Sequence, residues 1–171
     1  LVADCRDPQQ PEIRAAFDPY PAGILMMDVS VLGTIAYGAF LNVNPLLWSA
    51  LTLIDCRDLD HPAVTDQAGT GSLGSYALFV TPDSTAYVAN GRGVMGNPYP
   101  LLVFDCTDPA RIRLAGRYSS PNPSALGCDV QVAGDLVYLA SGYLSDMRRG
   151  ADTWYPNVQI FDRRDLALDM T

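Results

Sequence analysis

Short apolar runs separated by turn residues make up most of this 171-residue chain. Where the pattern is clearest, four such runs follow one another at residues 77–81, 85–90, 101–105 and 112–118. The first two are joined by Pro82-Asp83-Ser84, residue types that favour a tight turn. No window carries an apolar stripe at helical spacing for three turns. The pattern therefore predicts an all-β protein made of short antiparallel strands.

One phrase of this pattern recurs along the chain. A short apolar run leads to an Asp, two variable residues and a second Asp, as in LLVFDCTD from Leu101. The first Asp of each copy is Asp4, Asp55, Asp105 or Asp162, at spacings of 51, 50 and 57 residues. A second landmark has spacings of 50 and 51, at Ala36-Tyr37, Ala86-Tyr87 and Val137-Tyr138. Two independent landmarks with one period indicate an internal repeat.

Four short antiparallel strands in every 50 residues are typical of the blades of a β-propeller. On this interpretation the chain is a single propeller segment of about three and a half blades. A half blade occupies residues 1–17, complete blades occupy 24–68 and 77–118, and an incomplete blade occupies 128–171. A ring closes with about four blades or more, since an open one leaves a sheet edge unpaired. We therefore expect the ring to be completed by missing blades of a longer protein or by a second copy of the chain.

The repeated phrase also resembles a known family. LLVFDCTDP at residues 101–109 and LVADCRDP at residues 1–8 resemble the consensus of LVIVD-repeat β-propellers, a strand ending in Asp followed by an Asp-Pro turn. Residues 86–91, AYVANG, are similar to the second strand of that family's blade. Leu59 and Leu166 replace the proline in two copies, and the 50-residue period is longer than the family's usual blade. The resemblance implies a surface or secreted protein of poorly defined activity.

Charge limits the classes of partner. Eighteen Asp stand against one Glu, all eleven basic residues are Arg, and the formal net charge is −8. Such a chain is repelled by nucleic-acid backbones and by anionic membrane surfaces, so we expect neither as a partner. No apolar run approaches the roughly 18 residues of a membrane-spanning segment. A GC-rich genome and a loop-rich fold explain the excess of Asp, and a salt-adapted or calcium-rich extracellular setting is the alternative.

The cysteines fit a packing role better than a disulfide framework. Cys5, Cys56 and Cys106 occupy the same position in three successive repeats, directly after the first Asp. Equivalent positions in stacked repeats lie farther apart than the roughly 7 Å between α-carbons that a disulfide allows. Alternation along the strand places Cys106 on the same face as Leu102 and Phe104, so we expect these three thiols to be buried. No partner can be assigned to Cys128.

The order of strands predicts which end of the blades carries function. Because strands alternate in direction, the connections between second and third strands emerge at the same end as those between blades. This set is long, and the set at the opposite end is short throughout. Long loops on a rigid scaffold are where binding residues concentrate. The aromatic and arginine residues on the long loops form the predicted binding face: Trp48, Arg92, Tyr99, Tyr143, Arg148, Arg149, Trp154 and Tyr155.

Two interpretations of this binding face remain open. Aromatic and Arg side chains are favoured in contacts with proteins and glycans, since they bury much area at little entropic cost. Trp48, Tyr99 and Tyr155, however, fall within one residue of each other in the repeat. For these three we favour packing between blades. Trp154, Arg148 and Arg149 fit either role.

The repeated Asp-x-x-Asp turns suggest calcium binding, but the number of ligands argues against it. Calcium takes about six to eight oxygens, and two carboxylates in a tight turn supply too few. An Asp in a turn normally accepts hydrogen bonds from backbone amides two or three residues on, so we expect all four copies to be structural. Asp146 and Asp152, in the longest loop, are a separate candidate metal pair. We expect no cofactor.

Catalytic motifs are missing from the sequence. There is one histidine, His61, no Lys, no nucleophile elbow, no phosphate-binding glycine loop and no Cys-x-x-Cys pair. We therefore expect a non-enzymatic scaffold that presents its loop end to a protein or glycan in an extracellular, periplasmic or cell-surface setting. One alternative is an enzyme whose catalytic groups lie in missing blades; only Asp28 and Asp129, at equivalent places near the ring axis, support it. The other is a purely structural subunit of a larger complex.

Overall fold

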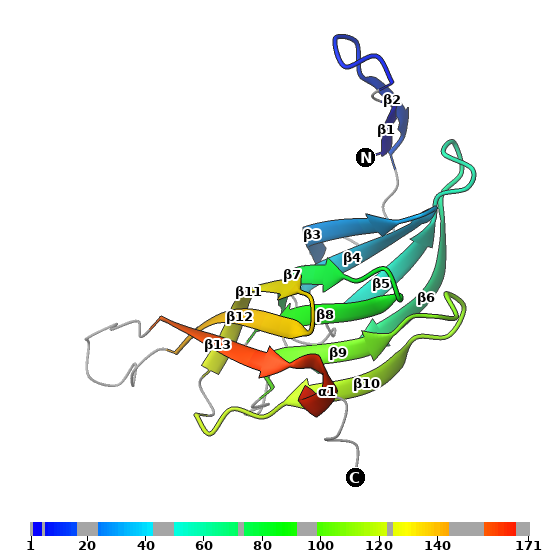
Figure 1. Cartoon of the computed structure of the whole chain (residues 1–171). Helices are drawn as coiled ribbons and strands as arrows, with labels where there is room; N and C mark the ends of the chain where they lie inside the picture. The colour runs from blue at the N-terminus through cyan, green and yellow to red at the C-terminus, as the bar shows by residue number, and fades with distance from the viewer. Residues whose placement is uncertain are drawn as a thin grey trace.

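The computed structural model describes residues 2–4, 6–16, 24–42, 50–71, 74–91, 99–122, 125–143 and 156–166. Within them the chain is all-β, as the apolar pattern predicts, with antiparallel strands and one single-turn helix (Figure 1). Valine, phenylalanine and tyrosine recur in the inner strands, and such residues pack well on a pleated surface.

Two four-stranded sheets follow the order of the sequence. The first sheet contains β3 (Ile24–Leu32), β4 (Ile35–Asn42), β5 (Ala50–Asp55) and β6 (Ala63–Gly69). The second sheet contains β7 (Ser75–Val80), β8 (Thr85–Asn90), β9 (Leu101–Asp105) and β10 (Arg113–Tyr118). In both sheets each strand pairs with the next one along the chain, so each is a simple meander.

A third sheet and an N-terminal hairpin complete the described strands. The third sheet contains β11 (Ala125–Ala133), β12 (Leu136–Tyr143) and β13 (Asn157–Asp162), again in sequence order. The single-turn helix α1 (Arg163–Leu166) follows β13 directly. The hairpin pairs β1 (Val2–Asp4) with β2 (Glu12–Ala15).

The strands lie close to the positions that the sequence predicts. The second and third strands of the second sheet match the predicted bounds. Its first strand begins two residues before the predicted start, because Ser75 already pairs with Asn90. The helix α1 is a difference, since the sequence carries no helical signal there. Leu166, the last residue of α1, is buried in the apolar cluster between the second and third sheets.

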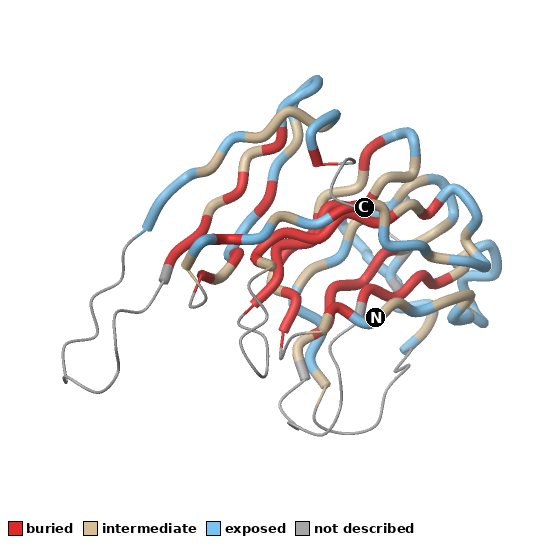
Figure 2. The backbone as a smooth tube through the Cα atoms, turned by 90° about the horizontal axis from the view of Figure 1, so that it is seen from below, coloured by how far each residue is buried: buried red, intermediate tan, exposed pale blue. Residues whose placement is uncertain are grey.

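The three sheets stack face to face, with the second sheet in the middle. Its first strand, β7, contacts β3 and β4 of the first sheet on one side and β11 of the third sheet on the other (Figure 1). One buried cluster joins the first and second sheets and includes Tyr37, Leu53 and Phe104. Another joins the second and third sheets and includes Tyr87, Val130 and Leu139. Buried residues therefore gather in the strands, and the turns are mostly exposed (Figure 2).

The first strand of each sheet carries a bulge at an equivalent place. The pairing shifts between Met26 and Asp28 in the first sheet, between Ser75 and Ala77 in the second, and between Gly127 and Asp129 in the third. The residues that follow the bulges pair with alanines, namely Asp28 with Ala39, Ala77 with Ala89 and Asp129 with Ala140. Bulges increase local twist, so the three first strands are re-aimed in the same way.

A second bulge recurs in the fourth strands and in the hairpin. Next to the pair Ile54–Val64, β6 has one extra residue that lies opposite no residue of β5. Next to the pair Phe104–Leu114, β10 has one extra residue relative to β9. In the hairpin the pairing shifts between Val2 and Ala3, at the equivalent step. The hairpin thus pairs in the same way as the third and fourth strands of the complete sheets.

One backbone hydrogen bond also recurs at the short turns. The residue after the first Asp of each repeated phrase donates its amide to a carbonyl in the turn between first and second strands. These bonds run from Cys56 to Thr34 (2.8 Å), from Cys106 to Ser84 (2.9 Å) and from Arg163 to Asp135 (2.9 Å). The two turns at this end of each sheet are therefore tied to each other.

Candidate functional site

The connections between strands divide the stack into two ends. At the first, the loop end, the ends of β4, β7, β8 and β9 meet around a small set of backbone contacts. Leu41 forms a bridge with Gly74, the Gly91 amide donates to the Gly74 carbonyl (2.6 Å), and the Asn90 amide donates to the Pro100 carbonyl (2.9 Å). This is the end from which the sequence predicts the binding loops to emerge.

The opposite end, the turn end, is built from the short turns. It holds Gly33-Thr34, Pro82-Asp83-Ser84 and Gly134-Asp135, together with the Asp-x-x-Asp turns. Gly33 and Gly134 have φ of 62° and 59°, so a two-residue turn forms there without the strain that a side chain brings.

Most of the predicted binding face lies outside the described residues. Tyr99 is described in full, and Tyr143 ends β12, although its side chain is not described. The other predicted residues, outside the described ranges, are Trp48, Arg92, Arg148, Arg149, Trp154 and Tyr155. The candidate metal pair Asp146 and Asp152 lies outside them as well.

Tyr99 is half-buried at the loop end. Its ring packs against the cluster between the first and second sheets, and the guanidinium carbon of Arg117 lies 4.3 Å from the ring centroid. Its carbonyl accepts a hydrogen bond from Asn90 Nδ2 (3.1 Å). These contacts favour the packing interpretation for Tyr99.

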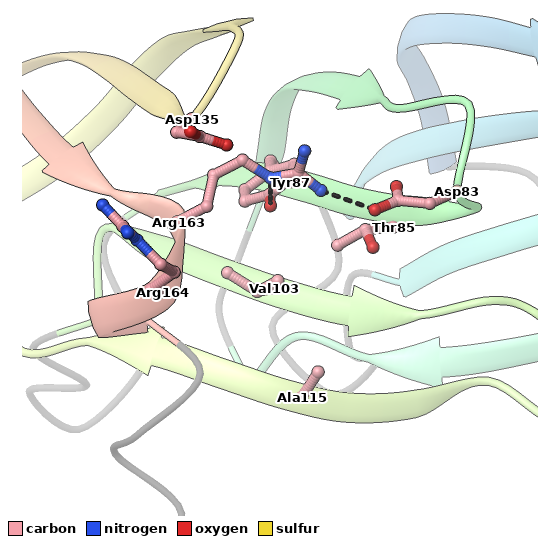
Figure 3. A pocket seen from close by; sticks show the side chains of 8 residues that line it. All are labelled: Asp83, Thr85, Tyr87, Val103, Ala115, Asp135, Arg163 and Arg164. Atoms are coloured by element: carbon pink, nitrogen blue, oxygen red, sulfur yellow. Dashed lines mark hydrogen bonds and ion pairs between the residues drawn. The ribbon is translucent and has the colours of Figure 1, made fainter.

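A hollow at the turn end was not expected from the sequence. It has a volume of about 350 Å³ and lies between the second and third sheets (Figure 3). Its charged residues are Asp83, Asp135, Arg163 and Arg164, and Tyr87 and Thr85 add hydroxyl groups. Two acidic and two basic side chains leave it without net charge.

Arg163 is the central residue of this hollow. Its Nε donates to the hydroxyl of Tyr87 (2.8 Å), and its Nη2 donates to Asp83 Oδ2 (2.7 Å). The guanidinium also lies 5.7 Å from the centroid of the Tyr87 ring. Tyr87 is only 2% exposed, so its hydrogen bond with Arg163 connects the end of the third sheet to a buried residue of the second.

Hydrogen bonds lower the pKa of the carboxyl groups at this end. The pKa of Asp83 falls to about 2, because the Thr81 hydroxyl and then Arg163 donate to it. The pKa of Asp162 also falls to about 2, because Arg164 donates to it from both its side chain and its backbone amide. Both carboxylates therefore stay charged over the whole physiological range.

Six of the eight carboxylates in the Asp-x-x-Asp turns make the local backbone hydrogen bonds that the sequence predicts. Asp7, Asp55, Asp58, Asp105, Asp108 and Asp162 each accept a hydrogen bond from the backbone amide two residues later, at 2.9–3.0 Å. Such Asx turns hold the chain as it leaves the third strand. His61 belongs to the same turn as Asp58, whose Oδ2 lies 3.0 Å from the imidazole, and its side chain is 84% exposed.

Asp28 links two sheets. Its Oδ1 accepts the Val29 amide (2.8 Å) within the bulge, and its Oδ2 accepts the Leu78 amide of the second sheet (2.8 Å). Asp129 makes the same local bond to the Val130 amide (2.8 Å). The carboxylate that the sequence places near the ring axis therefore has a packing role in the first sheet.

The cysteines differ in exposure. Cys106 is 2% exposed within the apolar cluster, as predicted, and burial raises the pKa of its thiol to about 12. Cys56 is half-buried, and burial raises the pKa of its thiol as well. Cys128 is an exposed free thiol at the bulge of β11, and Cys5 lies outside the described residues.

Sequence reasoning missed Arg163 because the repeat places small residues there. Cys56 and Cys106 hold the equivalent position in the other two sheets. The break in the pattern, an Arg where the other three copies have Cys, was the signal available in the sequence.

Most described polar groups at the turn end bond within their own turns, and the two Arg163 bonds join the third sheet to the second. Among the described residues no cluster of three His, Cys, Asp or Glu side chains is placed to hold a metal ion, and no helix there is long and apolar enough to cross a bilayer. No family model matches the chain, and no curated protein is significantly similar to it.

Proposed function

We propose that this chain is a segment of a β-propeller scaffold whose loop end binds another protein or a glycan. The observation that carries the proposal is the contrast between the two ends. The turn end consists of short turns whose side chains bond to their own backbone or to a neighbouring sheet, whereas β4 and β8 end at the loop end, where long connections follow in the sequence. A scaffold with short turns at one end and long loops at the other is typical of a binding module.

The architecture supports the propeller part of the proposal. Sequential four-stranded meanders stacked face to face, with bulges at equivalent positions, are what blades of one ring require. The hairpin of β1 and β2 repeats the pairing and the bulge of a third and a fourth strand. The resemblance to LVIVD-repeat propellers agrees with this order and favours a location outside the cytoplasm.

The binding role rests on the composition of the long loops. Trp154, Arg148 and Arg149 belong to the longest of them, between β12 and β13. Residues of these types supply most hot spots in protein interfaces, each with a cost of about 2 kcal/mol or more when truncated to Ala.

The test replaces Arg148, Arg149 and Trp154 with Ala together. The matched control replaces Arg57, Arg164 and Leu59, two arginines and one large apolar residue that are exposed at the turn end. Both variants and the unmodified chain are used to capture partners quantitatively from the organism of origin, with glycan arrays in parallel. We expect the loop variant to lose a specific partner by more than about tenfold while the control retains it. Equal recovery by all three proteins would rule the loop face out.

A structural-subunit role is the second candidate. It is favoured by the apolar residues that remain exposed on the outer faces of the stack, among them Val31 at 64% and Val158 at 66%. Such faces mark contact with further protein.

A further inference from the structure

Each sheet carries the same four-residue face. A tyrosine and an alanine of the second strand lie directly opposite two large aliphatic residues of the third strand, and we call this set the tyrosine face. Its members are Tyr37, Ala39, Leu51 and Leu53 in the first sheet, Tyr87, Ala89, Leu101 and Val103 in the second, and Tyr138, Ala140, Val158 and Ile160 in the third.

Two of the three tyrosine faces are buried. In the first and second sheets every member is 5% exposed or less. In the third sheet Val158 is 66% exposed and Ile160 is 59% exposed. The tyrosine face is thus covered in the first and second sheets and exposed in the third.

The cover of a tyrosine face is always the opposite face of the next sheet. Leu78 of β7 covers the first sheet, and Val130 of β11, at the equivalent position, covers the second. In the first sheet this position belongs to Val29 of β3, with Val31 two residues later. Val29 is 53% exposed and Val31 is 64% exposed, so the chain also has a covering face with nothing described beneath it.

The N-terminal hairpin does not remove this covering face. Arg14 of β2 binds Asp60 through two hydrogen bonds of 3.0 Å, which holds the hairpin beside the turn that follows β5. Val29 and Val31 keep their exposure with the hairpin in place. The two ends of the stack therefore carry the two halves of one contact.

We propose that the tyrosine face of the third sheet is covered by the β3 face of the first sheet of a second copy of this chain. The contact is head-to-tail, so two copies can each give one face and receive the other, which closes a dimer. Asp129 lies exposed beside the bulge on the open tyrosine face. In the first sheet the equivalent residue, Asp28, accepts an amide hydrogen bond from the strand that covers that sheet. This inference rests on the stacking of the sheets and is independent of the loop-face proposal.

The first experiment measures the mass in solution by light scattering across a wide range of concentrations. We expect twice 18.5 kDa, with weaker association at low salt because each copy carries a net charge of −8. Ile160→Asp and Val31→Asp should each give a monomer, because a charge then faces an apolar surface. Leu59→Asp is the control, since Leu59 is 41% exposed in a turn away from both faces, and it should remain dimeric.

Mixing the variants separates a surface effect from misfolding. Ile160→Asp keeps an intact β3 face and Val31→Asp keeps an intact tyrosine face, so an equimolar mixture regains one of the two contacts. We expect a mixed dimer from two proteins that are monomeric alone, each with the circular dichroism spectrum of the parent. Failure of the mixture to associate would overturn the head-to-tail arrangement.

Two other results would also overturn the proposal. A dimer that persists in both Asp variants uses another surface. A parent chain that stays monomeric at every concentration leaves a further sheet of a longer polypeptide as the occupant of the third tyrosine face, in place of a second copy.

Discussion

Arg163 shows how one side chain can fasten two sheets. We expect Arg163→Ala to lower the free energy of unfolding by about 1–2 kcal/mol, because Tyr87 loses a charged hydrogen-bond donor and Asp83 loses its ion pair. Arg164→Ala is the control, since Arg164 is exposed and its ion-pair partner among the described residues is Asp162 of its own turn. Urea unfolding followed by tryptophan fluorescence measures both. Equal midpoints for parent and Arg163→Ala would contradict the fastening role.

The hydrogen bonds that Asp83 accepts, first from Thr81 and then from Arg163, make stability depend on acid. Asp83 has a pKa of about 2 in the folded chain, below its usual 3.8, so the folded state favours the charged form. Its contribution is fully present above about pH 4 and is lost as the pH falls toward 2. We therefore expect the stability difference between the parent and Asp83→Ala to shrink over this interval. Thermal unfolding of both proteins from pH 6 to pH 2 measures it, and a constant difference would argue against the pair.

At this scale the sequence predicts what is local and misses what is long-range. The Asx turns at Asp55 and Asp105 follow from turn chemistry within a few residues. The contact from Arg163 to Asp83 spans 80 positions, and no rule of spacing connects them. The loop residues that the sequence singles out, such as Trp154, remain a prediction.

The first strands join the sheets through their bulges. We expect Asp28→Ala to lower the free energy of unfolding by about 1–3 kcal/mol, because the amide of the nearly buried Leu78 loses its acceptor. Asp129→Ala is the matched control, since it removes the equivalent local bond with Val130, and both variants are made in the Ile160→Asp chain so that this strand face stays uncovered. Denaturant titration of the two variants compares them. A larger loss in Asp129→Ala would refute a sheet-to-sheet role for Asp28.

Close approach of strands makes Gly127 sensitive to substitution. A β-carbon at Gly127 meets the carbonyl oxygen of Pro100 and comes within 2.9 Å of the Asn90 amide nitrogen, both backbone atoms of the second sheet. We expect Gly127→Ala to cost about 1–3 kcal/mol through overpacking. Gly69→Ala, with open space around its added carbon, should be neutral. Calorimetric midpoints for both variants provide the comparison, and a neutral Gly127→Ala would show that the sheets can move apart.

The existence and order of the strands are predictable, but their irregularities are not. Alternation and turn residues locate β8 and β9 to the residue. The bulges at Met27, Tyr76 and Cys128 share no residue type, so nothing in the sequence marks them. They depend on how neighbouring sheets fit together, which is a property of the stack.

The stack makes each sheet dependent on its neighbours. The second sheet is covered on both faces, whereas the first and third are each covered by a sheet on one. We expect amide hydrogen exchange to be slowest in β8 and β9 and faster in β12 and β13, because terminal units of a stack open first. The measurement uses Ile160→Asp, so that association does not protect the ends. Uniform protection would indicate a single cooperative unit.

At the scale of the whole molecule, the sequence predicts the repeated unit better than the closure of a ring. The period of about 50 residues predicts how many strands each unit holds, since that number depends on local turns. Closure of a ring would need a cover for the exposed Val29 and Val158. The number of blades remains a prediction.

The second sheet has Ala77 where the first has Asp28 and the third has Asp129, so the two contacts between neighbouring sheets are held by different bonds. The first and second sheets are linked at their first strands, where Asp28 accepts the Leu78 amide. The contact between the second and third sheets lacks that carboxylate and is linked at the turn end by Arg163. Salt screens the exposed ion pair at the turn end far more than a partly buried hydrogen bond to a backbone amide. We therefore expect added salt to weaken the contact between the second and third sheets more than the contact between the first and second.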